Sequence, residues 1–127
     1  MKILIVDDDA SIRRALGRAL SLSGFDIVVA GSGEEACELL QVNEVDLALI
    51  DFLMPGMAGS TLYHIIATQW PHLACRVIVM TGEPDDDDQD SWFALHRLPV
   101  LRKPFELQQM RDLIIQMTRG RREVNGH

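Results

Sequence analysis

Short apolar runs alternate with amphipathic segments along the whole chain, and this alternation restricts the fold more than any other feature of the sequence. The runs lie at residues 3–6, 25–29, 45–50, 77–80 and 99–101. Runs of this length bounded by turn-forming residues are typical of strands buried on both faces of a parallel sheet. The segments between them are long enough for helical crossovers. We therefore predict an α/β fold, a single doubly wound domain with helices on both faces of a parallel sheet.

The segments between the runs carry apolar residues at helical spacing. Their predicted buried positions are Ile12, Ala15, Leu16, Ala19 and Leu20, then Ala36, Leu39 and Leu40, then Leu62, Ile65 and Ile66, and last Leu107, Met110, Ile114 and Met117. Asp9 or Ser11 is available to cap the first helix, and Ser32 and Glu35 have the spacing of a capping box. Four consecutive acids at residues 85–88 predict a solvated loop and the start of a short fourth helix.

The predicted domain occupies residues 1–119. A chain of 127 residues with 47% hydrophobic content is the right size for one domain with a proper core. Pro71 is expected to close the third helix. We expect residues 120–127 to form a short polar C-terminal tail, with no effector domain, because neither a linker nor a repeat marks a second unit.

The net charge of −7 argues against nonspecific nucleic-acid binding, which depends on Lys and Arg neutralising phosphates. The exception is a group of arginines near the end, Arg119, Arg121 and Arg122. Such a group is more typical of a solvated helix terminus, where cations suit the helix dipole, than of a DNA-binding arm. We therefore expect no direct DNA binding.

The sequence predicts a cytoplasmic protein without a membrane anchor. The first apolar run meets Asp7 too soon for a signal peptide, and no segment approaches the roughly 18 apolar residues of a membrane span. Cys37 and Cys75 have no metal-binding spacing, so we interpret both as small buried hydrophobes in a reducing compartment.

Polar residues able to do chemistry follow four of the five predicted strands. They are Asp7 and Asp8 after the first strand, Asp51 after the third, Thr81 after the fourth and Lys103 after the fifth. Taken singly, each has an ordinary explanation as a turn, cap or surface residue. If the second strand lies at the edge of the sheet and the third in the middle, however, all of them surround one crevice at the carboxyl ends of the strands.

Several carboxylates in one crevice repel one another, and at about 4 Å with an effective dielectric of about 20 each pair costs on the order of 4 kcal/mol. A divalent cation relieves that repulsion, and carboxylate oxygens with spare water positions suit Mg²⁺. Lys103 adds a positive charge for a phosphoryl oxygen, and Thr81 adds a hydroxyl donor. We therefore predict that Asp51 is a nucleophile that accepts a phosphoryl group.

The ordered set of motifs resembles the CheY-like receiver domain of two-component response regulators. It comprises Ile3-Leu4-Ile5-Val6-Asp7-Asp8-Asp9, Asp51-Phe52-Leu53-Met54-Pro55-Gly56-Met57, Thr81-Gly82 and Lys103-Pro104-Phe105. The resemblance covers roughly residues 2–119. It implies a flavodoxin-like sheet with strand order 2-1-3-4-5, and transfer of phosphate to Asp51 from a phosphohistidine.

The same resemblance implies a role for each residue of the site. Asp7 and Asp8 would form the acidic pocket, and Asp8, Asp51 and the backbone carbonyl of Leu53 would ligate Mg²⁺. Thr81 and Lys103 would hold the phosphoryl oxygens. Leu53 and Glu83 lie at positions that tune the lifetime of the acyl phosphate in the family.

Three positions depart from the family pattern. Ala58-Gly59 stands where Asp-Gly is common, which predicts the loss of a helix cap and no chemical loss. Val100 stands where the family usually has its switch aromatic, so the familiar inward turn of a ring cannot occur in its usual form. Arg97-Leu98-Pro99 replaces a usual Gly-Ala, and the segment that follows looks similar to receivers of hybrid sensor kinases.

The favoured hypothesis is a phosphorylatable signalling switch whose partners are a sensor histidine kinase or phosphotransfer protein and an unidentified downstream protein. We expect a monomer or weak homodimer. An aspartyl-nucleophile phosphohydrolase is a second possibility, but residue 53 is not the second carboxylate that such an enzyme needs as general acid. A third is a degenerate receiver that binds partners without phosphorylation, which Val100 keeps open.

Overall fold

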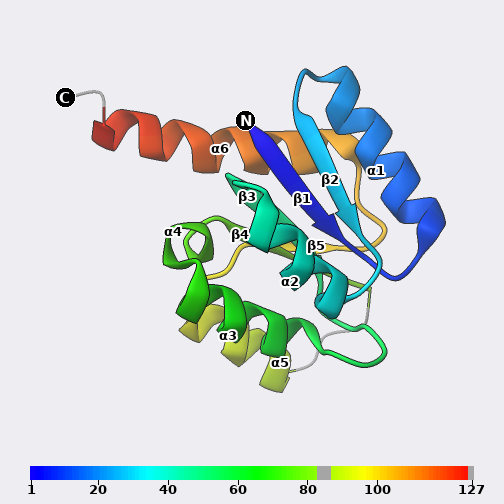
Figure 1. Cartoon of the computed structure of the whole chain (residues 1–127). Coiled ribbons are helices and arrows are strands. Elements are labelled where there is room, and N and C mark those ends of the chain that lie inside the picture. Colours follow the sequence, from blue (N-terminus) through cyan, green and yellow to red (C-terminus); the bar gives the residue numbers. More distant parts are fainter. Residues whose placement is uncertain (83–86, 126–127) are drawn as a thin grey trace.

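The computed structural model describes residues 1–82 and 87–125, of which residues 119–125 are described by backbone alone. Within these residues, five parallel strands form one sheet (Figure 1). They are β1 (Lys2–Val6), β2 (Asp26–Ala30), β3 (Leu47–Asp51), β4 (Val77–Thr81) and β5 (Val100–Arg102). Their order across the sheet is β2-β1-β3-β4-β5. The predicted fold class and strand order are therefore confirmed.

Helices cover both faces of the sheet (Figure 1). They are α1 (Ala10–Leu22), α2 (Gly33–Val42), α3 (Gly59–Gln69), α4 (Pro71–Ala74), α5 (Asp87–Leu95) and α6 (Leu107–Asn125). Helices α1 and α6 pack on one face, and α2 to α5 pack on the other. We did not predict α4: Pro71 does not merely close the preceding helix but begins a new turn, for which its fixed φ is suited. Helix α6 continues past the expected end at residue 119.

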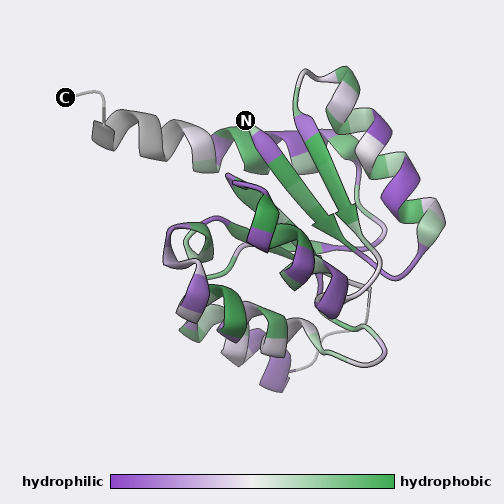
Figure 2. Ribbon diagram, in the orientation of Figure 1, coloured by the Kyte–Doolittle hydropathy of each residue, from purple (hydrophilic) through white to green (hydrophobic). Residues whose placement is uncertain are grey.

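Two apolar layers, one on each face of the sheet, make up the core. The residues of β3 and β4 are all buried, as are all of β1 except Lys2, which is why these segments are continuous apolar runs (Figure 2). Strand β2 lies at the edge and is only partly buried. Two expected core positions are wrong. Ala15 of α1 is exposed. Leu107 is 41% exposed, because the buried stripe of α6 begins one turn later at Met110 and continues to Ile114.

The loops at the carboxyl ends of β1, β2 and β3 lead into helices α1, α2 and α3, and the starts of α1 and α2 have side-chain caps. Asp9 caps α1, accepting hydrogen bonds from the amides of Ser11 and Ile12 at 2.8 and 3.3 Å. Ser32 caps α2 as predicted, but Glu35 accepts from the amide of Gly31 instead of completing the box on Ser32. Ala58 at the start of α3 makes no side-chain cap, so the expected loss is confirmed.

The cysteines differ from expectation. Cys37 is half-buried, but Cys75 is exposed, so the interpretation of Cys75 as a buried hydrophobe is wrong. Cys75 follows the short helix α4 at the surface, which the sequence pattern did not predict. Both thiols are free.

Among the described residues, none of the helices combines the length and apolarity that crossing a bilayer requires.

Helix α5 ends on a left-handed residue that is not glycine. Arg97 has φ +56°, and its amide donates to the carbonyl of Ala94 at 3.1 Å. The amide of Leu98 donates to the carbonyl of Phe93 at 2.9 Å. This pair of bonds is the Schellman motif, in which glycine normally occupies the left-handed position. The departure at Arg97 thus places a strained residue where a glycine would fit.

We predict that Arg97→Gly stabilises the fold by about 1 kcal/mol, because it removes left-handed strain that exceeds the entropic cost of glycine. Urea unfolding at pH 7 measures the change. Arg97→Ala is the matched control, since alanine keeps the strain and is expected to give no gain. If alanine stabilised the protein as much as glycine, strain at this position would not be the cause.

Candidate functional site

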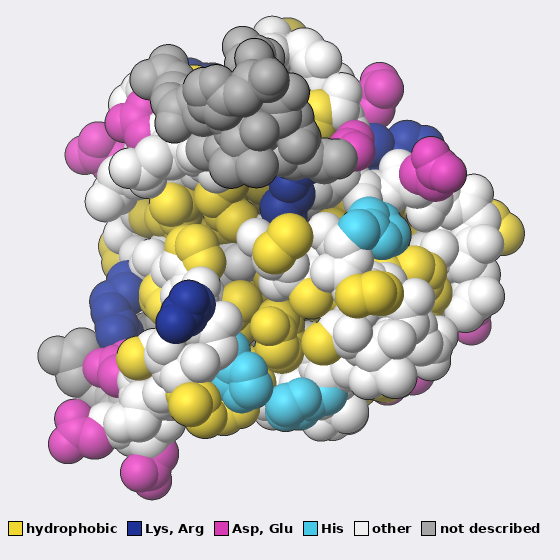
Figure 3. All heavy atoms as spheres, turned by 90° about the vertical axis from the view of Figure 1, so that its left-hand side faces the viewer, with side chains coloured by type: hydrophobic (Ala, Val, Ile, Leu, Met, Phe, Trp, Pro, Cys, Tyr) yellow, Lys and Arg dark blue, Asp and Glu magenta, His cyan; other side chains and the backbone are white. Residues whose placement is uncertain are grey.

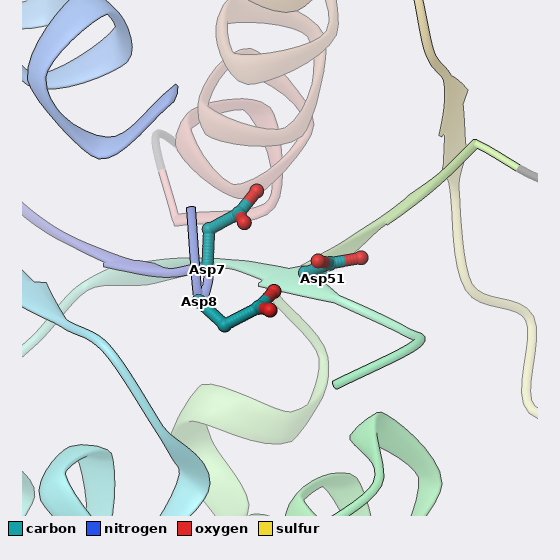
Figure 4. Close-up of side chains that lie close together, drawn as sticks. All are labelled: Asp7, Asp8 and Asp51. Atoms are coloured by element: carbon teal, nitrogen blue, oxygen red, sulfur yellow. The ribbon is translucent and has the colours of Figure 1, made fainter. Parts of the chain in front are cut away.

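The predicted site residues converge at the carboxyl ends of the strands. Asp7 follows β1, Asp51 and Thr81 end β3 and β4, and Lys103 follows β5. Figure 4 shows the carboxylates of Asp7, Asp8 and Asp51 gathered at one place. One oxygen from each of the three lies within 4.8 Å of the others. The sheet order therefore brings together loops that are far apart in the chain.

Asp7 is held rigidly at the floor of the site. It is fully buried, and its two carboxylate oxygens have separate partners. One accepts the amide hydrogen of Asp9 at 2.9 Å, and the other accepts a hydrogen bond from the Lys103 ammonium at 2.9 Å. The Arg13 guanidinium donates to the Asp7 carbonyl at 2.7 Å. Sequence reasoning missed Arg13, whose only signal was its place one turn into the first helix.

Lys103 links the two buried carboxylates. Its Nζ lies 2.9 Å from Asp7 Oδ2 and 3.5 Å from Asp51 Oδ2. Burial by itself lowers the pKa of Lys103, but the hydrogen bond to Asp7 and the negative charges of Asp51 and Asp7 together raise the pKa above its ordinary value. The ammonium is therefore a permanent positive charge beside Asp51.

Asp51 carries the most perturbed carboxyl. Burial, followed by the charge of Asp7, raises the pKa of Asp51 to about 6, although Lys103 and the amide of Leu53 act in the opposite direction. The residue is only 6% exposed. At pH 7 it is mostly ionised, but holding that charge costs free energy. A cation bound beside it would recover this cost.

Thr81 supplies a hydroxyl that lacks a partner. Its Oγ1 is buried and has no hydrogen-bond partner among the described residues. A buried hydroxyl left in this way normally costs stability, so its persistence favours a role toward a ligand oxygen. The carboxylate oxygens suit a hard divalent cation as metal ligands. The Thr81 hydroxyl suits an oxyanion, to which it can donate a hydrogen bond.

Leu53 and Glu83 are the remaining predicted positions. The amide of Leu53 donates to Asp51 Oδ1 at 3.4 Å, so the loop after β3 is tied to the Asp51 carboxyl. Metal binding by the Leu53 carbonyl stays a prediction. Glu83 lies outside the described residues.

Gly59 brings helix α3 against the loop after Asp51. A Cβ at this position would lie 2.7 Å from the Cα of Phe52, closer than real contacts allow. The Gly59 amide donates to the Phe52 carbonyl at 3.0 Å. Only glycine fits at position 59, and its close contact fixes the backbone that follows Asp51.

Comparison with known proteins identifies one family. The model of the response regulator receiver domain matches residues 3–115. The chain is 36% identical over 121 residues to a cyclic di-GMP phosphodiesterase of Thermotoga maritima, covering 95% of this chain. It is 34% identical over 119 residues to the response regulator protein FleR of Pseudomonas aeruginosa, covering 94% of this chain. The chain spans 32% and 25% of the lengths of these two relatives.

A solved structure has the same fold. The signal receiver domain of an HD domain-containing protein from Pseudomonas fluorescens Pf-5 superposes with a TM-score of 0.85 at 28% identity. The match covers 96% of this chain and 97% of that one. The likeness thus extends over nearly the whole of both chains.

We predict that the contribution of Asp51 to the stability of the metal-free protein falls as the pH rises from 3.8 to about 6 and remains lower above that range. The reason is that the folded state binds the Asp51 proton more tightly than the unfolded chain does. Asp51→Asn cannot ionise, so we expect it to exceed wild type at pH 7 by up to about 3 kcal/mol, measured by urea unfolding in EDTA.

The matched control is Asp26→Asn, an exposed carboxyl on β2 that is expected to leave stability unchanged. If Asp51→Asn were no more stable than wild type at pH 7, the ionised Asp51 carboxylate would not be destabilising the folded protein.

Proposed function

Because the chain belongs to the receiver domain family of two-component response regulators, we propose that Asp51 accepts a phosphoryl group from the phosphohistidine of a sensor histidine kinase or phosphotransfer protein. The observation that supports this most directly is that two further carboxylates and the Lys103 ammonium lie close to Asp51. At the end of the neighbouring strand, Thr81 has a buried hydroxyl without a hydrogen-bond partner among the described residues. Each member provides what phosphoryl transfer needs: a nucleophile, a cation pocket and charge stabilisation.

The transfer step follows from these positions. An ionised Asp51 oxygen attacks the phosphorus atom, the new O–P bond forms, and the P–N bond breaks. The electron pair of that bond goes to the imidazole nitrogen, which then takes up a proton. The Lys103 ammonium and the Thr81 hydroxyl stabilise the phosphoryl oxygens, Lys103 by its charge and Thr81 by donating a hydrogen bond.

The acidic pocket supports a Mg²⁺ site. Asp7, Asp8, Asp51 and the Leu53 carbonyl are the proposed holders, and Asp8 is exposed where a hydrated ion enters. When bound, Mg²⁺ offsets the repulsion among the carboxylates and the charge of the incoming phosphoryl group. The raised pKa of Asp51 fits this assignment, because burial and the charge of Asp7 together outweigh the opposing effect of Lys103.

Phosphorylation would act as a signal by changing which proteins the domain binds. The downstream partner is proposed to be a protein, since a net charge of −7 disfavours direct DNA contact.

We propose a cytoplasmic domain that acts without contacting a membrane, as a monomer or weak homodimer. One relative is named a phosphodiesterase, but this chain spans 32% of it, and the proposed function here is signalling.

The proposal is tested by incubating the protein with Mg²⁺ and acetyl phosphate or phosphoramidate and measuring intact mass. Wild type is expected to gain one labile phosphoryl group, and Asp51→Asn none, because it lacks the nucleophile. Asp9→Asn is the matched control, since asparagine caps a helix as well as aspartate and Asp9 lies outside the acidic cluster.

Other outcomes would contradict the proposal. Turnover of small phosphate esters without a stable mass gain would indicate a phosphohydrolase. Neither a gain nor turnover, in a folded protein that still binds partners, would indicate a binding-only domain.

We predict that Mg²⁺ raises the melting temperature of wild type at pH 7.5 and does so less at pH 5.5. The ion binds only the folded state, and protonation of Asp51 near pH 6 competes with it. Differential scanning fluorimetry with and without EDTA measures the shift. We expect Asp8→Asn to reduce it and Asp9→Asn to retain it. An equal shift in Asp8→Asn would place the ion elsewhere.

A further inference from the structure

The strand that carries Lys103 has no aromatic ring at position 100. Val100 is half-buried and packs against the apolar cluster on the face covered by α2 to α5. The valine side chain is short, and it has no ring that could adopt two alternative positions. Residue 100 therefore cannot link a change at the site to a change at the surface of β5. If the site communicates with the surface, another side chain must make the connection.

Phe52 follows Asp51 directly and is tied to the site through the backbone. Its amide donates to the Met80 carbonyl on β4 at 2.8 Å, and its carbonyl accepts from Gly59 at 3.0 Å. The Asp51 carboxylate accepts a hydrogen bond from the Leu53 amide, so this bond spans Phe52. A phosphoryl group on Asp51 uses a carboxylate oxygen and alters the charge that this amide faces. Phe52 therefore lies in the loop on which phosphorylation acts first.

The Phe52 ring contacts two aromatic rings of helix α5. Its centroid lies 4.7 Å from that of Phe93 in an edge-on arrangement and 5.4 Å from that of Trp92 in a tilted one. Phe93 is the only residue of α5 that is buried. The contact with Phe52 thus falls on the residue that anchors the helix and on its immediate neighbour.

Trp92 extends this contact to the surface. Its ring lies 5.6 Å from Tyr63 of α3 and 4.4 Å from His96, between centroids. His64 of α3 is exposed and lies 5.5 Å from His96. These four residues, Tyr63, His64, Trp92 and His96, form what we call the α3–α5 aromatic surface. Figure 3 shows histidine and hydrophobic side chains gathered together on the side of the molecule where α3 and α4 lie.

We propose that Phe52 couples the phosphorylation state of Asp51 to helix α5, and that the α3–α5 aromatic surface is where the change is displayed. The inference rests on the proposed function of Asp51. It assigns to Phe52, a positioning residue, the connection that β5 cannot make through Val100. Close-packed rings cannot deform continuously, so a shift of Phe52 displaces Trp92 and Phe93 together.

The chain supplies its own reporter, because it contains two tryptophans, Trp70 and Trp92. The Trp70→Phe protein retains Trp92 alone, and its emission is recorded before and after acetyl phosphate with Mg²⁺. Intact mass of the same samples gives the phosphorylated fraction, and Mg²⁺ without donor is the baseline. We expect the emission to change in proportion to the phosphorylated fraction. The Trp92→Phe protein, which retains Trp70, is expected to show no such change.

Substitution at Phe52 tests the coupling itself. In the Trp70→Phe background, Phe52→Leu is expected to reduce the emission change by about half or more at equal phosphorylation, whereas Phe52→Tyr, which keeps the ring, is expected to preserve it. Thermal melts confirm that each variant is folded. A full response in Phe52→Leu, or phosphorylation with unchanged Trp92 emission, would overturn the coupling and leave the function of Asp51 intact. A mass unchanged by the donor would overturn both.

Discussion

The structure depends on a single lysine ammonium placed between two buried carboxylates. Lys103 lies 2.9 Å from Asp7 and 3.5 Å from Asp51, so one positive charge faces two negative ones, with a third carboxylate, Asp8, close by. Burial, followed by the charge of Asp7, raises the pKa of Asp51 to about 6 in spite of Lys103. A site in this condition favours an additional cation. The site also holds the Asp51 carboxyl mostly ionised at neutral pH, at a cost in stability that binding of a cation would recover.

The sheet explains why these groups meet. Strand β1 lies between β2 and β3, and β4 and β5 follow on the other side, so the loops after four strands open onto one edge. Strand β2 is displaced to the border, and the residues after it contribute a helix cap instead of a reactive group. Glycine at position 59 then allows α3 to approach the loop after Asp51 more closely than any side chain would permit. Fold and site are consequences of the same crossover topology.

The aromatic residues show how a local change can extend beyond the site. Strand β5 has valine and no ring at position 100. Phe52 instead packs against Phe93 and Trp92, and Trp92 packs against Tyr63 and His96. Helix α5, with one buried residue and a left-handed arginine at its end, is anchored by fewer side chains than α1, α2 or α3. Such an element is suited to respond to a neighbouring loop.

The sequence by itself determined the layered fold and indicated which polar residues follow the strands, although not Arg13, because apolar periodicity and the position of polar groups after strands are local properties. It also predicted the cap of α2 by Ser32 and the missing cap at Ala58. Tertiary structure decided the rest: that Leu107 is exposed, that Pro71 begins a helix, that Arg97 is left-handed, and that the Thr81 hydroxyl has no hydrogen-bond partner within the described part of the chain. It also decided the pKa of Asp51 and the rings that Phe52 contacts. These depend on distances between residues remote in sequence, and periodicity carries no information about such distances.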